Sequence, residues 1–275
     1  MDERQSDWHA AAELGGSVWD RYERDLVPAI FGTWVNDLVE LAHLQGGERV
    51  LDVACGTGVV ARGVRQALGD AGIVAGSDIN RDMLEVARAA AGPLAIEWRQ
   101  ADACALPFAD SDFDVVMCQQ GLQFVPDRAV ALGEMFRVLT TGGRAVVAVW
   151  SPIERSPGFG ALADAIERSI GAEAAGGLRR GPFGYGSSEK LEGELAAAGF
   201  RDVRVQTRQK AVRFPSSDEF VLRYAMGSPL APAFSSASDE VRMQVITEVS
   251  TALEEFTSAG ELTFPIASHL GVGLR

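Results

Sequence analysis

Three aspartates and a glycine-containing loop are the residues of this 275-residue chain whose types and spacing point to chemistry. The segment VLDVACGTGVVARG, residues 50–63, places Asp52, Gly56 and Gly58 between an apolar run and a helix-like one. Asp78 and Asp102 follow two later runs, in GIVAGSDIN and EWRQADACALPF. Ligands of open α/β sheets bind outside the carboxyl ends of the strands, so the three carboxylates are expected at one crevice.

The glycine loop alone leaves two kinds of ligand open. Its two glycines and Ala61 satisfy the pattern G-x-G-x-x-G/A, which is typical of dinucleotide-binding proteins. Asp78 lies 20 residues after Gly58, the spacing at which a carboxylate can accept both ribose hydroxyls. Asp102 could accept from an exocyclic amine such as that of adenine. Asp52 beside the loop disfavours a pyrophosphate and favours a cationic amino-acid group, so the residues predict an adenosine with a positively charged tail.

An alternation of short Val/Ile-rich runs and helix-like segments must position these residues, and it predicts βαβ units with a parallel sheet. Strands are expected at 49–54, 73–78, 95–99, 113–118 and 143–150. Helices are expected near 59–69, 80–91 and 127–139, the last capped by Asp127. Flanking elements are a helical segment over 17–44 broken near Pro28, a strand at 200–213, two helical segments within 216–258 and a last strand at 261–274.

Composition excludes several other classes of protein. The net charge of −13 disfavours a nucleic-acid partner. No apolar stretch approaches the roughly 20 residues that span a bilayer, and the acidic start MDERQSDWHA resembles no targeting signal, which together predict a cytoplasmic protein. Cys55, Cys104 and Cys118 lack C-x-x-C spacing, and with three histidines in the chain no metal site is expected.

The motifs resemble those of class I S-adenosylmethionine-dependent methyltransferases, particularly the ubiquinone/menaquinone-type C-methyltransferases. The resemblance covers about 45–150 and rests on VLDVACGTG, on GSDIN followed by RDMLEVAR, on QADACALPFADSDFDVVMC and on EMFRVLTTGGRAVVAVW. It implies an α/β, Rossmann-like, seven-stranded and mostly parallel sheet with an antiparallel last strand. It also implies that S-adenosylmethionine is the cofactor and S-adenosylhomocysteine the product. The implied cofactor-binding residues are Asp52, Ala54, Gly56, Gly58, Asp78, Ile79, Met83, Asp102, Ala103 and Gln119.

The chain departs from the family pattern after the fourth strand, where QQGLQF replaces the histidines that the family often has. No catalytic base stands out: His9 is a weak candidate, and the catalytic residues stay unassigned. The acceptor site is expected from a helical lid at 1–44 and from cap insertions near 151–186 and 216–258. Together with the cofactor-binding core at 45–150 and the rest of the core within 151–275, these segments give the expected domain organisation. The candidate acceptor-binding residues are Trp19, Tyr22, Phe31, Gln120, Gln123, Tyr185 and Tyr224.

These observations favour an enzyme that transfers a methyl group from S-adenosylmethionine to a small, largely apolar acceptor. The sulfonium already activates the methyl group, so in-line displacement would depend on proximity, alignment and exclusion of water. Whether oxygen, nitrogen or carbon is methylated is left open, as is the oligomeric state. The alternative is a protein of the same fold that binds the cofactor without methylating, such as a cyclase or a binding protein.

Overall fold

The computed structural model describes residues 17–275, which form two compact units. The unit that we call the sheet unit contains Gly32–Ser151, Tyr185–Arg208 and Ser268–Arg275. The helical unit contains the described residues up to Phe31, together with Pro152–Gly184 and Gln209–Ala267. Residues 32–44, which the sequence groups with the lid, thus lie in the sheet unit.

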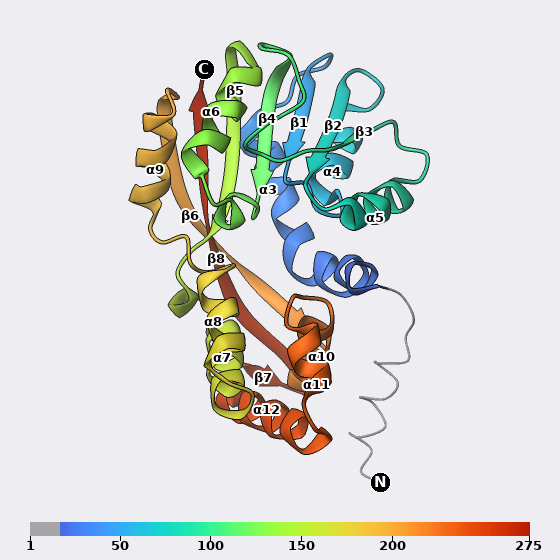
Figure 1. Cartoon of the computed structure of the whole chain (residues 1–275), viewed down its shortest axis with the longest axis vertical. Helices are drawn as coiled ribbons and strands as arrows, with labels where there is room; N and C mark the ends of the chain where they lie inside the picture. Colours follow the sequence, from blue (N-terminus) through green and yellow to red (C-terminus); the bar gives the residue numbers. More distant parts are fainter. Residues whose placement is uncertain (1–16) are drawn as a thin grey trace. The chain divides into compact units, whose positions relative to one another are not determined.

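The sheet has seven strands in the order β3-β2-β1-β4-β5-β8-β6, and an eighth strand, β7, pairs with β8 alone. Strands β3, β2, β1 and β4 lie side by side in Figure 1. Pairing is parallel from β3 to β5, and β5 and β8 are antiparallel. The strands are β1 (Arg49–Val53), β2 (Ile73–Asp78), β3 (Glu97–Gln100), β4 (Phe113–Gln119), β5 (Leu139–Trp150), β6 (Arg201–Phe214), β7 (Thr257–Ser258) and β8 (Glu261–Leu274). The expected sheet with its antiparallel last strand is confirmed; β7 was not expected.

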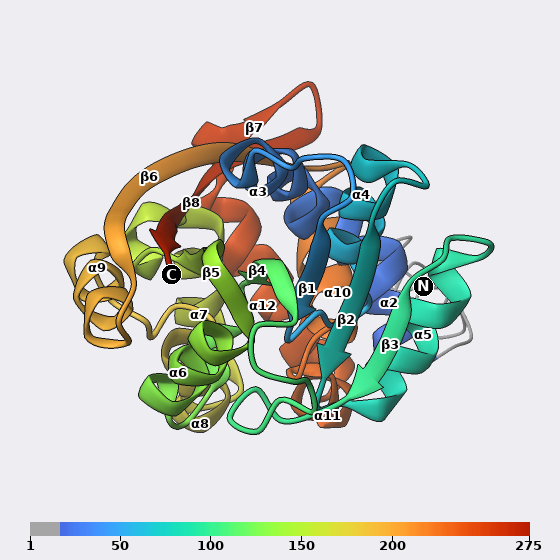
Figure 2. The ribbon, with the colours of Figure 1, turned by 90° about the horizontal axis from the view of Figure 1, so that it is seen from above.

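Helices connect the parallel strands of the sheet unit. Their starts follow the capping residues of the sequence: the side chain of Asn80 accepts from the backbone N–H groups of Asp82 and Met83, and Asp127 accepts from that of Val130. Between β3 and β4 the chain forms only a loop. Figure 2 shows α6 and α9 next to each other, and they are in contact. The helical segments are η2 (Gly32–Trp34), α3 (Val35–Ala42), α4 (Val59–Leu68), α5 (Arg81–Ala91), η3 (Leu122–Phe124), α6 (Arg128–Val138) and α9 (Ser188–Ala197).

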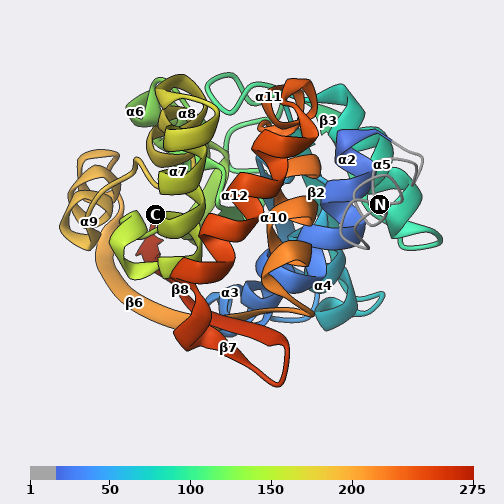
Figure 3. The same ribbon diagram turned by 90° about the horizontal axis from the view of Figure 1, so that it is seen from below.

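The helical unit is built around Phe159, whose ring centroid lies 5.0–5.7 Å from those of Phe183, Phe220, Tyr224 and Phe264. Helix α7 contacts α8 and α12, and α12 contacts α10, an arrangement that Figure 3 shows. The expected break near Pro28 corresponds to the π-helix η1, which contains that proline. The helical segments are α2 (Val18–Arg21), η1 (Tyr22–Phe31), η4 (Ile153–Arg155), α7 (Pro157–Ser169), α8 (Ala172–Arg180), α10 (Ser217–Met226), α11 (Ala231–Ser236), α12 (Asp239–Ala252) and η5 (Glu254–Phe256).

Candidate functional site

Asp52 is a buried carboxylate with one unpaired oxygen at the end of β1. Its side chain is 1% exposed, and its Oδ2 accepts from the backbone N–H of Ala61, in the first turn of α4, at 3.0 Å. The other oxygen, Oδ1, is buried and has no hydrogen-bond partner. Burial, together with the negative charge of Asp78, raises the pKa of Asp52 to about 8. A cationic group beside Oδ1 would stabilise the ionised form.

Asp78 connects the end of β2 to the glycine loop. Its Oδ2 accepts from the backbone N–H of Gly56 and its Oδ1 from that of Asn80, both at 2.8 Å. Burial also raises the pKa of Asp78, against these backbone hydrogen bonds. A carboxylate has about four acceptor sites, so each oxygen can still accept from a ligand hydroxyl.

The two loop glycines are required for different reasons. Gly56 has a φ of +54°, and an added Cβ would lie 3.7 Å from the Sδ atom of Met83, at ordinary contact distance. At Gly58, which has a φ of +81°, an added Cβ would lie 2.3 Å from Cη2 of Trp98. A side chain at position 58 would thus collide with the ring of Trp98 on β3.

The residues after β2 and β3 lie next to each other, because the backbone N–H of Ala101 donates to the carbonyl oxygen of Asp78 at 3.0 Å. Ile79 presents an apolar side chain that is 66% exposed. Asp102 is exposed, and its Oδ1 accepts from the backbone N–H of Cys104 at 2.8 Å. Ala103 packs against the core of the sheet unit. The structure thus brings the three sequence-predicted aspartates to the carboxyl edge of neighbouring strands.

The turn after β4 touches the turn after β1. An added Cβ on Gly121 would lie 2.5 Å from Cβ of Ala54. Ala54 and Gln120 have φ values of 53° and 56°, in the left-handed region that non-glycine residues rarely adopt. Backbone strain of this kind clusters at functional sites. The partly buried Gln119 precedes this strained turn.

Gln120 and Gln123 are buried polar residues, 5% and 8% exposed. The Nε2 of Gln120 donates to Oγ of Ser268 at 3.0 Å, and the Oε1 of Gln123 accepts from the backbone N–H of Trp150 at 3.3 Å. Ser268, on β8, could not be predicted from the sequence, because it lies 148 residues from Gln120 and no local pattern marks it.

Other predicted acceptor-binding residues are placed elsewhere. Tyr185 is 1% exposed in the core of the sheet unit, and its hydroxyl donates to Glu194 at 2.5 Å. These contacts indicate that Tyr185 packs in the core. Four of the predicted residues belong to the helical unit: Trp19, Tyr22, Phe31 and Tyr224. The ring of Tyr22 contacts those of Trp19 and Phe31, and the ring of Tyr224 packs on Phe159. Their role in acceptor binding stays a prediction.

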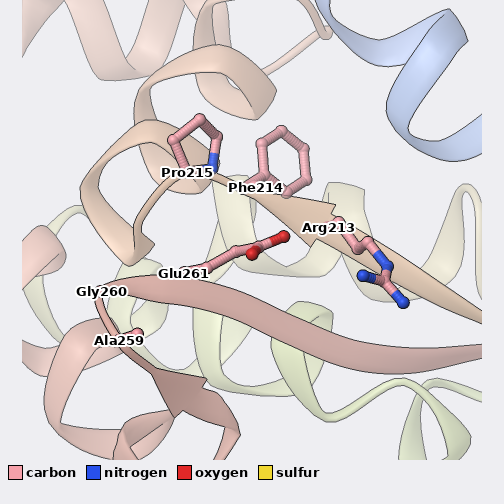
Figure 4. Close-up of a pocket in the computed structure, with 6 residues that line it drawn as sticks. All are labelled: Arg213, Phe214, Pro215, Ala259, Gly260 and Glu261. Carbon is pink, nitrogen blue, oxygen red and sulfur yellow. The ribbon is translucent and has the colours of Figure 1, made fainter.

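A cavity of about 440 Å³ lies in the helical unit, where β6 ends and β8 begins. Figure 4 shows its six lining residues, which are Arg213, Phe214, Pro215, Ala259, Gly260 and Glu261. None of them belongs to the predicted site, and the group contains no nucleophile or histidine.

The surroundings of the remaining residues that could act as a base or a nucleophile indicate structural roles. His43 ends α3 in the left-handed conformation, and the Nδ1 of the buried His269 lies 2.7 Å from Oγ1 of Thr207. His9 lies outside the described residues. Burial raises the pKa of Cys118 to about 12, which keeps it a thiol at neutral pH. Over residues 17–275, no cluster of His, Cys, Asp and Glu has the arrangement of a metal site.

No helix within residues 17–275 has both the length and the apolar character needed to cross a membrane.

The strand order and the carboxylates at the carboxyl edge of the sheet are those of the Rossmann-like methyltransferase class. Within this class, residues 17–160 match the model of the ubiE/COQ5 methyltransferase family, and the chain belongs to this family. The sequence-based expectation of a methyltransferase related to ubiquinone/menaquinone biosynthesis enzymes is confirmed.

Relatives support the assignment over different lengths. A ubiquinone/menaquinone biosynthesis C-methyltransferase UbiE of Xylella fastidiosa strain M12 is 41% identical over 52% of this chain, which spans 59% of that relative. Its counterpart from strain 9a5c is 36% identical over 70% of this chain and 83% of the relative. A demethylmenaquinone methyltransferase of Deinococcus radiodurans is 33% identical over 78% of this chain and 92% of the relative.

Solved structures share the fold at lower identity. The YcgJ protein of Bacillus subtilis has a TM-score of 0.57 at 20% identity, covering 88% of this chain and 98% of that one. A [4+2]-cyclase, SpnF, has a TM-score of 0.51 at 22% identity, covering 88% of this chain and 80% of that one. The same fold therefore carries more than one kind of chemistry.

Proposed function

We propose that this chain binds S-adenosylmethionine at the carboxyl edge of β1, β2 and β3 and transfers its methyl group to a small, largely apolar acceptor. The observation that carries the proposal is the buried carboxylate of Asp52, whose Oδ1 has no partner. A buried ionised carboxylate needs an opposite charge or hydrogen-bond donors, and the amino-acid end of this cofactor supplies both.

The other residues of the edge fit the rest of the cofactor. Asp78, held by two backbone N–H groups, offers two carboxylate oxygens to the vicinal hydroxyls of a ribose. The exposed side chain of Ile79 and the partly exposed Met83 offer apolar surface for an adenine ring. Asp102, exposed after β3, has a second oxygen, Oδ2, available for the adenine amine.

When bound, the cofactor supplies an activated methyl group on a sulfonium. The residues of the chain would position the cofactor and the acceptor rather than act as an acid or a base. The strained turns at Ala54 and Gln120 would hold the backbone beside the methionine end, and the buried amides of Gln120 and Gln123 would orient an acceptor. The names of the relatives refer to demethylmenaquinone and to ubiquinone/menaquinone biosynthesis, and a small apolar ring is the acceptor class that we infer for this chain.

Calorimetric titration with S-adenosylmethionine, S-adenosylhomocysteine and NAD tests the cofactor assignment. We expect the first two to bind and NAD not to bind. Asp78→Ala should weaken cofactor binding by about 1–3 kcal/mol, because charge-assisted hydrogen bonds are lost. Asp70→Ala, an exposed carboxylate after α4, is the matched control and should bind as the unmodified chain does. NAD binding without binding of the two sulfur compounds would refute the proposal.

Turnover separates a methyltransferase from a cofactor-binding protein. A screen of phenols, naphthols and quinols, read as release of S-adenosylhomocysteine, should give at least one acceptor. Tight cofactor binding with no release from any of these ring classes would instead favour a non-methylating member of the fold.

A further inference from the structure

The guanidinium of Arg137, in the last turn of α6, holds the loop that connects β3 to β4. Its Nη1 donates to the carbonyl oxygen of Phe108 at 2.8 Å and to Oδ1 of Asp110 at 2.7 Å. Its Nη2 donates to the carbonyl oxygen of Leu106 at 3.0 Å. The side chain of Asp110 is 77% exposed, so its ion pair contributes little. The two backbone carbonyls are therefore the contacts through which α6 fixes the path of the loop.

Glu134, which precedes Arg137 by three residues on the same helix, completes the attachment. Both of its carboxylate oxygens accept from the guanidinium, Oε1 from Nε at 2.7 Å and Oε2 from Nη2 at 2.8 Å. The same Oε2 accepts from the backbone N–H of Leu106 at 2.8 Å. A bidentate pair of this kind fixes the plane of the guanidinium. The two side chains together hold both backbone polar groups of Leu106.

The turn that contains Asp102 lies close to this attachment. Residues 101–112 form neither a helix nor a strand, so side chains take over part of their backbone pairing. Within the turn, the backbone N–H of Cys104 donates to Oδ1 of Asp102 at 2.8 Å, and that of Ala105 donates to the carbonyl oxygen of Asp102 at 3.0 Å. Leu106 follows directly and is 5% exposed in the core of the sheet unit. A shift of Leu106 would therefore move the carboxylate of Asp102.

We propose that Arg137 and Glu134 are positioning residues for the adenine of the cofactor, because they hold the loop that presents Oδ2 of Asp102 to the adenine amine. This inference rests on the proposed function, which assigns that contact to Asp102. A pair that only stabilised the fold would not change how the folded chain discriminates between purines. A positioning pair changes the contribution of the amine and leaves the rest of the cofactor site intact.

Two ligands with different substituents at position 6 of the purine test the proposal. S-adenosylhomocysteine carries an amino group there, and S-inosylhomocysteine carries a carbonyl oxygen, which cannot donate to Asp102. In calorimetric titrations of the full chain, S-adenosylhomocysteine should bind at least about tenfold more tightly, because the amine makes a charge-assisted hydrogen bond. Asp102→Ala should lower this preference, and its value shows what remains without the carboxylate.

Arg137→Lys keeps the positive charge but has a single nitrogen, which cannot hold both backbone carbonyls and Glu134. Its preference for S-adenosylhomocysteine should fall close to that of Asp102→Ala. Combining the two substitutions should lower the preference no further, because they act on the same contact. Glu134→Gln keeps one accepting oxygen and should give an intermediate preference. This milder variant also carries the test if Arg137→Lys does not fold, which circular dichroism at the titration temperature shows.

Arg144, on β5, provides the matched control, because it makes the same kinds of contact beside the start of β4. Its Nη1 and Nη2 donate to the two carboxylate oxygens of Glu48 at 2.8 and 2.9 Å, and its Nη2 also donates to the carbonyl oxygen of His43 at 3.2 Å. Arg144→Lys thus removes a bidentate pair and a backbone contact away from the carboxyl edge of the sheet. It should keep the full preference for S-adenosylhomocysteine.

The possible failures have different meanings. If the unmodified chain does not bind S-adenosylhomocysteine, the proposed function itself is wrong. If it binds both ligands equally, Asp102 does not contact the amine, and the positioning role is wrong while cofactor binding stands. If the folded variants at Arg137 and Glu134 keep the full preference, or lose affinity for both ligands by the same factor, the pair only stabilises the fold and the positioning role is refuted.

Discussion

Binding of S-adenosylmethionine is expected to expel a proton from Asp52. Burial raises the pKa of this carboxyl to about 8 in the free chain, so about nine-tenths of the molecules hold the proton at pH 7. A cation beside the unpaired Oδ1 favours the ionised form and lowers this pKa. Binding at pH 7 should therefore release about 0.9 proton per cofactor, and the affinity should rise about tenfold per pH unit between pH 6 and pH 7.

Calorimetry in two buffers of different ionisation enthalpy measures the released protons. The dependence of the observed binding enthalpy on the buffer should give a slope near the predicted proton number for the unmodified chain. Asp52→Asn carries no titrating carboxyl, and its slope should fall close to zero. Asp70→Ala should keep the full slope. A slope of zero in the unmodified chain, or an unchanged slope in Asp52→Asn, would show that Asp52 does not release the proton; the latter result would point to Asp78, whose pKa is also raised.

The same carboxyl predicts how stability depends on pH. The pKa of Asp52 is higher in the folded chain than the value of about 3.9 expected in the unfolded chain. Between pH 4 and pH 8 the folded state then binds one more proton, so the free energy of unfolding falls as the pH rises, by about 1.4 kcal/mol per unit. Urea unfolding of Asp52→Asn should lack this contribution, and its stability relative to the unmodified chain should increase from pH 5 to pH 8.

Two further substitutions test contacts that support the site and the sheet unit. Gly58→Ala should lower the free energy of unfolding by about 1–3 kcal/mol more than Gly142→Ala, because only the former meets the ring of Trp98 while both have a φ near +80°. Equal losses in urea unfolding would show that the ring does not restrict this position. Glu134→Gln should cost about 1–2 kcal/mol at pH 7, because the carboxylate accepts from the guanidinium of Arg137, which lowers the pKa of Glu134. This pairing is present above the unfolded pKa and is lost as the pH falls, so the difference should shrink in unfolding experiments below about pH 4; a constant difference would exclude the ionic contribution.

The positions of Asp52, Asp78 and Asp102 could be predicted from the sequence, because apolar runs mark strands and turn residues mark where they end. A parallel sheet then places all three strand ends at one edge. The number of strands and the antiparallel pairing of the last one came from the family resemblance. A local pattern also predicts the cap at Asp127, which accepts from a backbone N–H group three residues away.

Contacts between distant segments could not be predicted in this way. The ring of Trp98, on β3, packs over Gly58, in the loop after β1. Tyr185 occurs in a segment rich in glycine, yet it packs in the core and donates to Glu194. Ser268 reaches Gln120 because β8 returns beside β5. Each of these contacts depends on how the strands and helices pack, and residue type and periodicity carry no signal for such packing.

The unsatisfied groups of the sheet unit indicate why its site takes this form. Three buried atoms without partners lie at or just after the ends of the neighbouring strands β1 and β4: Oδ1 of Asp52, Oε1 of Gln120 and Nε2 of Gln123. Replacing any of them by an apolar group of the same shape would remove a desolvation penalty, so stability alone does not explain them. Ala54 and Gln120 add two strained backbone positions at the same strand ends. The amino-acid end of a sulfonium cofactor would satisfy the carboxylate oxygen at β1, and polar groups of an acceptor would satisfy the amides after β4. Their occurrence on adjacent strands would bring the methyl donor and its acceptor to one edge of the sheet.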